Sequence, residues 1–254
     1  EIGKIRRPDV WVISDARLAL AEIADNIEYI DRSEWHSALK GWKEDNPLNT
    51  NGSDGRVQPY EIFDALNKIT GENSIVTTDV GQHQMWSAQM CKTRLPRTFL
   101  SSGGLGTMGY GLPAAMGAQV AFPEKNVFII AGDGSILMNS QELMTSVENK
   151  LPVKILLFNN GYLGMVRQWQ QIFYDRRYAS TDISAQPDFI ALANAYGAAG
   201  IRVEKSEDLE AALAKSLEIK DRPCFIDIHV AREACVLPMI PAGGSVEDMI
   251  LELD

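Results

Sequence analysis

The chain has 254 residues, of which 45% are hydrophobic and 23% charged, and its formal net charge at pH 7 is −10. These values are ordinary for a globular protein that buries a full core. They disfavour a nucleic-acid-binding protein, because neutralising phosphates needs clustered Lys and Arg, and the apolar runs are too short to span a membrane.

The cysteines and histidines give no sign of a cross-linked or metal-stapled fold. Cys91, Cys224 and Cys235 are odd in number, lie far apart and show no CxxC spacing, and the three histidines are equally scattered. This arrangement disfavours a disulfide framework and a zinc site, and it favours a reducing compartment.

The first part of the chain predicts the end of a domain. Residues 10–14, VWVIS, have the composition of a strand, and Asp15 can cap the helix that follows. Residues 33–46 have the spacing of an amphipathic helix. Because the chain enters this pattern directly at Glu1, we expect a fragment in which residues 1–45 close a preceding domain.

Residues 46–57 are rich in Asn, Gly, Ser and Pro and predict a linker. Beyond it, apolar runs alternate with amphipathic segments. Strands are expected at residues 74–79, 98–102, 126–132, 153–160, 200–204 and 223–230. Helices are expected at residues 58–70, 84–91, 110–121, 140–149, 187–197 and 206–218. This alternation predicts a doubly wound, mostly parallel α/β sheet over residues 58–254, with helices on both faces.

Polar or glycine-rich segments follow several of these strands directly. They are DVGQH, SGGLGTMG, GDGS and NNGYLG, at residues 79–83, 102–109, 132–135 and 159–164. In an open parallel sheet, ligands bind at the edge formed by the carboxyl ends of the strands. The four segments therefore predict one ligand site.

Asp133 and Asn160 end two successive predicted strands and lie 27 residues apart, which leaves room for one helix and one returning strand. Carboxylate and amide oxygens that converge there suit a hard cation such as Mg²⁺ or Ca²⁺, and the amides of GDGS suit a phosphate group. The rival is a nicotinamide- or flavin-binding domain, because GLGTMG at 104–109 matches GxGxxG and Asp133 then serves as the ribose-binding acid. That rival explains neither the two glycines around Asp133 nor its pairing with Asn160.

GDGS, with NN 27 residues after its aspartate, resembles the cofactor-binding motif of thiamine-diphosphate enzymes. The stretches TDVGQHQMW, SSGGLGTMGYGLPAAMGA, NNGYLGMVRQWQ and VLPMIPAGG together are similar to the catalytic subunit of acetolactate synthase (acetohydroxyacid synthase). The resemblance covers essentially the whole chain. It implies that residues 1–45 end a Rossmann-like central domain, that residues 58–254 form the thiamine-diphosphate-binding domain, and that the amino-terminal pyrimidine-binding domain is absent.

The resemblance also implies site residues. Asp133, Asn160 and the carbonyl of Tyr162 would bind the metal ion, and Met108 would wedge beneath the bent cofactor, whose pyrimidine Gly106 approaches through its backbone. The cofactor-binding set that it implies is Gln82, His83, Gly106, Met108, Asp133, Gly134, Ser135, Asn160, Tyr162, Leu163, Gly164 and Met165. Met85, Gly103 and Gly104 resemble positions that touch FAD, and Met165, Val166 and Trp169 resemble positions that line the substrate channel.

The activity implied is the condensation of two pyruvates, or of pyruvate with 2-ketobutyrate, to 2-acetolactate or 2-aceto-2-hydroxybutyrate, with release of CO2. It belongs to branched-chain amino-acid biosynthesis and depends on thiamine diphosphate and Mg²⁺, with FAD as a further cofactor. The activating glutamate of the family lies in the absent amino-terminal domain, so the chain alone is expected to have negligible activity.

The resemblance further implies a homodimer or homotetramer of the full catalytic subunit, which a regulatory subunit can join, and no nucleic-acid or membrane partner. The implied location is the bacterial cytoplasm or the interior of an organelle. Two alternatives stay open at this point. One is another thiamine-diphosphate enzyme, such as a pyruvate oxidase or a 2-ketoacid decarboxylase, and the other is a cofactor-binding module without catalysis.

Overall fold

The computed structural model describes residues 1–48 and 55–253, and the chain divides into two compact units, residues 1–48 and 49–254. Half of the predicted linker, residues 49–54, lies outside the described residues. Each unit is considered by itself below.

The first unit holds two helices, α1 (Ala16–Asp25) and α2 (Ser33–Asp45). The predicted cap is confirmed, because the carboxylate of Asp15 accepts hydrogen bonds from the N–H groups of Arg17 and Leu18. The predicted strand at residues 10–14 is wrong. A strand needs a neighbour for its backbone N–H and C=O groups, and no strand of the described chain pairs with this segment, whose side chains are exposed.

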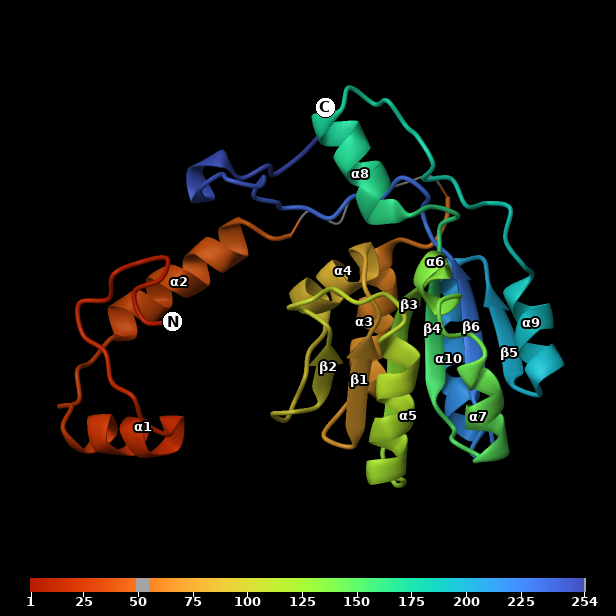
Figure 1. Ribbon diagram of the computed structural model, residues 1–254, viewed down its shortest axis with the longest axis horizontal. Coiled ribbons are helices and arrows are strands. Elements are labelled where there is room, and N and C mark those ends of the chain that lie inside the picture. Colours follow the sequence, from red (N-terminus) through yellow and green to blue (C-terminus); the bar gives the residue numbers. More distant parts are fainter. Residues whose placement is uncertain (49–54, 254) are drawn as a thin grey trace. The chain divides into compact units, whose positions relative to one another are not determined.

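The second unit is built on one six-stranded sheet in which every pairing is parallel, with the order β2-β1-β3-β4-β6-β5 (Figure 1). This confirms the predicted α/β sheet. The strands are β1 (Ser74–Thr78), β2 (Phe99–Ser101), β3 (Asn126–Gly132), β4 (Lys154–Asn159), β5 (Ala199–Val203) and β6 (Cys224–His229). The central strands β3 and β4 are buried at every residue except Asn126 and Asn159 at their ends, as expected for a parallel sheet covered on both faces.

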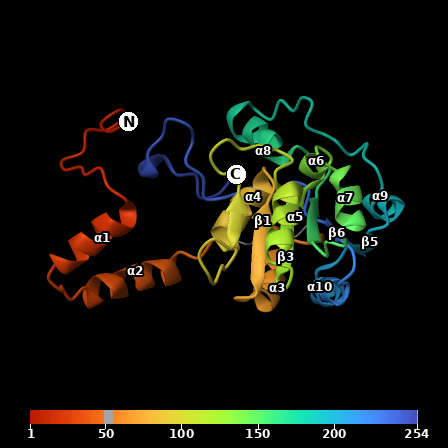
Figure 2. The same ribbon diagram turned by 60° about the horizontal axis from the view of Figure 1, so that its bottom comes forward.

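Helices cover both faces of this sheet, so the fold is doubly wound (Figures 1 and 2). One face packs against α3 (Pro59–Ile69), α4 (Gln82–Met90) and α10 (Leu209–Glu218). The other packs against α5 (Gly111–Ala121), α7 (Glu142–Glu148) and α9 (Phe189–Tyr196). Two 3₁₀ turns, Ser206–Asp208 and Val246–Asp248, complete the regular structure of this unit apart from α6 and α8.

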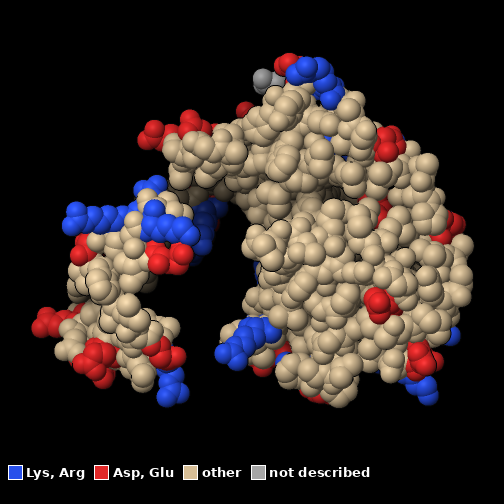
Figure 3. Space-filling model, in the orientation of Figure 1, with Lys and Arg blue, Asp and Glu red and all other residues tan. Residues whose placement is uncertain are grey.

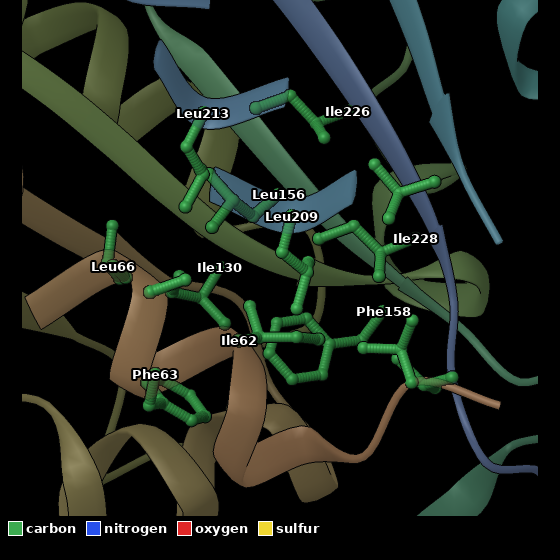
Figure 4. Packing of buried hydrophobic residues seen from close by; sticks show 14 of the residues in the cluster. Ile62, Phe63, Leu66, Ile130, Leu156, Phe158, Leu209, Leu213, Ile226 and Ile228 are labelled. Carbon is green, nitrogen blue, oxygen red and sulfur yellow. The ribbon is translucent and has the colours of Figure 1, made fainter. Parts of the chain in front are cut away.

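Successive side chains along each strand point to opposite faces of the sheet and so contribute to both hydrophobic layers. On β4, Leu156 and Phe158 point to the layer of α3, α4 and α10, whereas Ile155 and Leu157 point to the opposite layer. Figure 4 shows the first layer, in which Leu156 and Ile226 pack among side chains of α3 and α10. Burying this apolar surface is the main favourable contribution to folding.

Two helices at the carboxyl edge of the sheet are absent from the sequence-based prediction. α6 (Asp133–Ile136) is a single turn directly after β3, and α8 (Gly164–Phe173) follows the segment that leaves β4 (Figure 1). A four-residue turn is too short to show helical periodicity.

The order of strands places a topological switch point between β1 and β3. The chain runs outward from β1 to β2 and then returns to β3 on the other side of β1. In such folds the crevice outside the carboxyl ends of the two central strands is the usual ligand site. Residues 79–83 leave β1 and residues 132–135 end β3, so both lie at this switch point.

The surface charges and the cysteines indicate no further site in this unit. On the face of this unit shown in Figure 3, charged side chains are scattered singly or in small groups of mixed sign. All three cysteines are unpaired. Among the described residues, no helix combines the length and apolar character needed to cross a bilayer.

We expect Leu156→Ala to lower the free energy of unfolding by roughly 3 kcal/mol, because Leu156 is fully buried in a central strand and its truncation leaves a cavity. Urea denaturation measures this loss. Leu251→Ala, at a side chain that is 64% exposed, is the matched control and should change stability by less than about 0.5 kcal/mol. Equal losses in the two variants would contradict the packing described here.

Candidate functional site

A cavity of about 120 Å³ lies at the carboxyl ends of β1, β3 and β4. Most of the cofactor-binding residues predicted from the sequence line it, although they come from four separate segments of the chain. They are Gln82, His83, Met108, Asp133, Gly134, Ser135, Asn160, Tyr162, Leu163, Gly164 and Met165, and Val166 of the predicted channel lines it too.

Asp133 lies at the centre of this edge as the first residue of α6. Since β3 and β4 pair with Gly132 opposite Phe158, the carboxylate of Asp133 reaches the segment that leaves β4. Its Oδ2 accepts a hydrogen bond from the N–H of Gly161 at 2.6 Å, and its Oδ1 accepts one from the N–H of Gly134 at 2.9 Å. Burial raises the pKa of this carboxyl to about 6, and these two backbone hydrogen bonds oppose the rise.

The segment from Asn160 to Tyr162 is held tightly beside Asp133. The Oδ1 of Asn160 accepts a hydrogen bond from the N–H of Tyr162 at 3.0 Å. The Nε of Arg232 donates to the carbonyl of Asn160 at 3.0 Å, and its guanidinium lies 4.3 Å from the centre of the Tyr162 ring. The ring of Tyr162 also has the guanidinium of Arg167 at 5.3 Å. Two arginines therefore fix the loop that carries two of the predicted metal ligands.

The oxygens of Asp133, of Asn160 and of the Tyr162 backbone form a donor set suited to Mg²⁺, which prefers oxygen ligands and keeps several waters. No cluster of three or more His, Cys, Asp or Glu side chains occurs among the described residues. A metal ion at this edge would therefore be held by a mixed set with one carboxylate.

The glycines on either side of Asp133 leave room for their neighbours. A Cβ on Gly132 would lie 2.8 Å from the ring of His83, and one on Gly134 would lie 2.9 Å from Cδ2 of Leu163. Ser135 closes the turn, because its hydroxyl donates to the carbonyl of Gly132 and accepts from the N–H of the same residue, both at 3.1 Å.

His83 is a buried imidazole whose Nε2 has no hydrogen-bond partner. Burial lowers its pKa to about 3, so the ring is neutral at physiological pH. A buried polar atom without a partner costs free energy, and here it borders the cavity. A ligand with oxygen atoms is one way to satisfy it.

The side-chain amide of Gln82 leaves its oxygen without a partner, whereas a contact to a diphosphate would need its N–H₂ group. Its Nε2 donates to the Oε1 of Gln168 and to the carbonyl of Ala234, both at 2.8 Å. Gln168 is itself oriented by the backbone of Val236. The Oε1 of Gln82 is left without a partner and would lie 2.1 Å from a Cβ on Gly164. Gln82 thus offers the cavity an acceptor, and donating to a diphosphate would require it to exchange one of its present bonds.

Met108 and Gly106 lie on the glycine-rich loop that precedes α5. Met108 lines the cavity, and its Cε lies 4.0 Å from the position that a Cβ on Gly134 would take. Gly106 is exposed, has φ of +65° and donates its N–H to the carbonyl of Ser102 at 2.9 Å. Gly106 does not line the cavity, although a Cβ there would lie 3.8 Å from Cγ1 of Val80, which does.

The predicted channel residues gather on α8. Met165 and Trp169 line a second, mostly apolar cavity of about 610 Å³ together with Met85 and the segment Ile240–Ala242. Val166 and Trp169 also line a neighbouring cavity of about 440 Å³. Trp169 is 48% exposed, so it is not a core aromatic.

The three positions predicted to touch FAD do not form one site. Met85 belongs to the apolar cavity, whereas Gly103 and Gly104 are exposed, and a Cβ on either would meet no atom within 4 Å. The described residues therefore supply no cradle in which these three positions converge.

Several residues that shape the site were not predicted from the sequence. Trp86, Phe158 and Val230 line the cavity, and Arg232 and Gln168 orient its polar groups. Gln168 belongs to NNGYLGMVRQWQ, one of the stretches that carry the family resemblance, but nothing in that stretch indicates that it orients Gln82. Arg232 follows the last strand as a single charged residue without any local pattern.

The comparisons with known proteins agree with this geometry. The family model described as the C-terminal TPP binding domain of thiamine pyrophosphate enzymes matches residues 79–228. This range begins directly after β1 and ends in β6, so it contains every residue that lines the first cavity except Val230.

Among curated proteins, the acetolactate synthase large subunit of Corynebacterium glutamicum is 45% identical over 98% of this chain and 41% of its own length. The mitochondrial acetolactate synthase catalytic subunit of Saccharomyces cerevisiae is 44% identical over 98% of the chain and 37% of its length. The chloroplastic acetolactate synthase 1 of Nicotiana tabacum is 42% identical over 100% and 40%. The predicted resemblance is confirmed, and the chain spans about two fifths of the length of these relatives.

We expect His83 to make the stability of the chain depend on pH. An unfolded histidine binds a proton below about pH 6.5, whereas the folded ring stays neutral down to a pKa of about 3, so lowering the pH favours the unfolded state. Between pH 7 and pH 5 this linkage removes roughly 2 kcal/mol of the free energy of unfolding. Urea denaturation of the chain and of His83→Gln at both pH values measures it. The variant should lose less stability on acidification, and equal losses would contradict a neutral buried His83.

Proposed function

Because the chain belongs to the thiamine pyrophosphate enzymes, as the match over residues 79–228 shows, we propose that it is the thiamine-diphosphate-binding part of an acetolactate synthase catalytic subunit. The observation that carries the proposal is the hydrogen bond from the N–H of Gly161 to the carboxylate of Asp133, beside the first cavity. There a buried carboxylate, an amide oxygen and closely spaced backbone amides meet at the carboxyl ends of β3 and β4, beside the switch point of the sheet.

In this proposal, Asp133, Asn160 and the carbonyl of Tyr162 would hold Mg²⁺, which would offset the negative charge of the diphosphate. Gly134 and Ser135 lie at the start of α6, where backbone N–H groups suit phosphate oxygens. His83 supplies a neutral imidazole whose unpartnered Nε2 borders the same space. Arg232 holds the segment Asn160–Tyr162 in place through the carbonyl of Asn160.

When bound, thiamine diphosphate supplies a nucleophilic carbon and accepts the electrons released by decarboxylation. The chain's own part is to position the cofactor. Met108, opposite Gly134, would support the angle between its two rings, and Gly106 would offer its backbone to the pyrimidine. Leu163, Gly164 and Met165 would close the cavity over the cofactor from the start of α8.

The proposed substrates are pyruvate and 2-ketobutyrate, as in acetolactate synthesis. The apolar cavity formed by Met85, Met165 and Trp169 suits the methyl or ethyl group of a small ketoacid, and Met165 lines both this cavity and the cofactor cavity. Val166 and Trp169 would help to select the second ketoacid.

The remaining parts of the proposal rest on the similarity to acetolactate synthases. Residues 1–45 would end a central domain, residues 46–57 would link it to the domain of residues 58–254, and a pyrimidine-binding domain would come from elsewhere in the enzyme. FAD would be a further cofactor, although the positions assigned to it share no cavity. A homodimer or homotetramer, a regulatory subunit, and a place in the bacterial cytoplasm or in an organelle belong to the same proposal.

The rival dehydrogenase is disfavoured on two grounds. A ribose-binding acid gives no reason for the contact of Asp133 with the segment that leaves β4, and the family model that matches is that of the thiamine pyrophosphate enzymes. A pyruvate oxidase, a 2-ketoacid decarboxylase or a non-catalytic binding module stays within the same cofactor class.

We expect Asp133→Ala to abolish Mg²⁺-dependent binding of thiamine diphosphate, because it removes the anionic ligand of the metal ion. Isothermal titration calorimetry with and without Mg²⁺ measures the affinity. Asp175→Ala is the matched control, since this carboxylate is 91% exposed and lies outside the cavity. Unchanged affinity in Asp133→Ala would remove the metal site from this edge.

We expect the chain alone to convert pyruvate negligibly, and a protein that joins it to the preceding part of an acetolactate synthase to form acetolactate. Product analysis separates acetolactate from the acetaldehyde of a decarboxylase and the acetyl phosphate of an oxidase. Robust acetolactate formation by the chain alone would contradict the need for a second domain. Acetaldehyde or acetyl phosphate as the product of the joined protein would contradict the proposed reaction.

A further inference from the structure

Asp79 is a fully buried acid to which the proposed function gives no role. It directly follows β1, and its backbone N–H donates to the carbonyl of Ile130 at 2.8 Å, which extends the pairing of β1 with β3 by one residue. Burying a carboxyl group is costly unless its oxygens are well bonded. The contacts of this side chain therefore need an explanation.

One oxygen of Asp79 links two distant segments. Its Oδ1 accepts a hydrogen bond from the N–H of Val80 at 2.9 Å and another from the N–H of Gly109 at 2.8 Å, 30 residues further along the chain. Its Oδ2 is buried and has no hydrogen-bond partner. Burial raises the pKa of this carboxyl, and the hydrogen bonds from the backbone N–H groups of Gly109 and Val80 oppose the rise.

The same glycine is held from its other side. The carbonyl of Gly109 accepts a hydrogen bond from Nδ2 of Asn139 at 2.7 Å. Gly109 has φ of +90°, and a Cβ there would lie 2.8 Å from Nδ2 of Asn139, so no other residue fits without a shift. Asp79 and Asn139 together grip Gly109 through its N–H and its C=O.

The N–H that Asp79 binds belongs to the peptide bond between Met108 and Gly109. Met108 is flexible by nature and 37% exposed, so packing alone does not fix it. Its side chain nevertheless lines the cavity opposite Gly134. We propose that Asp79, with Asn139, is a positioning residue that sets Met108 against the rings of the bound cofactor, an inference that rests on the proposed function.

Thr77 provides a matched control two residues earlier on β1. It is fully buried as well, and its Oγ1 donates to the carbonyl of Gly111 at 3.0 Å. Thr77→Val thus removes one buried hydrogen bond to the start of α5 and leaves the bonds to Gly109 in place.

The test measures the affinity of the 254-residue chain for two ligands, each in the presence of Mg²⁺. The ligands are thiamine diphosphate and inorganic pyrophosphate. Pyrophosphate probes the half of the site around Asp133 and lacks the rings that Met108 would touch. We expect Asp79→Ala to bind thiamine diphosphate about tenfold more weakly, the order expected for a lost hydrogen bond to a charged group, and to bind pyrophosphate normally. Thr77→Val should keep the ratio of the two affinities unchanged.

Asp79→Ala could act through the nearby Ser135 hydroxyl or through misfolding. Asn139→Ala is therefore a second variant, because Asn139 is half-buried and holds the carbonyl of the same Gly109. It should produce the same selective loss. Combined with Met108→Ala, either change should add nothing further, since the residue that it positions is already gone.

A loss that affects both ligands equally, no loss at all, or additive effects with Met108→Ala would overturn the positioning role while leaving the proposed function standing. Failure of the unaltered chain to bind either ligand would instead overturn the proposed function and this inference with it.

Discussion

The site depends on one feature of the sheet, the parallel pairing of β3 with β4. That pairing brings the chain out of both strands at the same edge, and it places the carboxylate of Asp133 2.6 Å from the N–H of Gly161. Asn160 and Tyr162 then lie beside the acid, where the guanidinium of Arg232 contacts both. A shift of one residue in this register would turn the strand residues to the opposite faces of the sheet and separate the two loops. The buried apolar side chains of both layers, which specify the register, therefore also specify the site.

The same edge of the sheet is incompletely hydrogen-bonded. Three buried side-chain atoms without partners, Oδ2 of Asp79, Oε1 of Gln82 and Nε2 of His83, come from the five residues that leave β1. Each such atom costs about 1–3 kcal/mol when nothing binds it. In the same cavity the pKa of Asp133 is raised to about 6, which brings its protonation closer to neutral pH. A cation beside Asp133 would lower that pKa, and an oxygen-rich ligand beside His83 would give its Nε2 a partner, so binding and stability are coupled here.

Most of the fold could be predicted because its strands are continuous apolar runs and several of its helices, such as α3 and α10, are amphipathic, and both patterns are local. The strand expected at residues 10–14 failed since composition alone does not supply a pairing partner. The convergence of Asp133 and Asn160 followed from spacing and from the rule that parallel strands end at one edge. Gln82 shows where such reasoning stops. Its position was predicted, but which end of its amide faces the cavity depends on Gln168 and on the backbone of Val236, contacts that span 86 and 68 residues.

The two glycines around Asp133 could be explained as turn residues, and the backbone argues against that explanation. Gly132 has φ of −95°, and neither it nor Gly134 belongs to the glycines with positive φ, so other residues could adopt both conformations. What excludes a side chain is space, because a Cβ would collide with the ring of His83 on one side and with Leu163 on the other. Those neighbours are themselves cavity-lining residues. The glycines therefore allow the close approach of the imidazole of His83 and the side chain of Leu163 to the backbone around one carboxylate, and in the proposed function a side chain at either would narrow the space for the diphosphate.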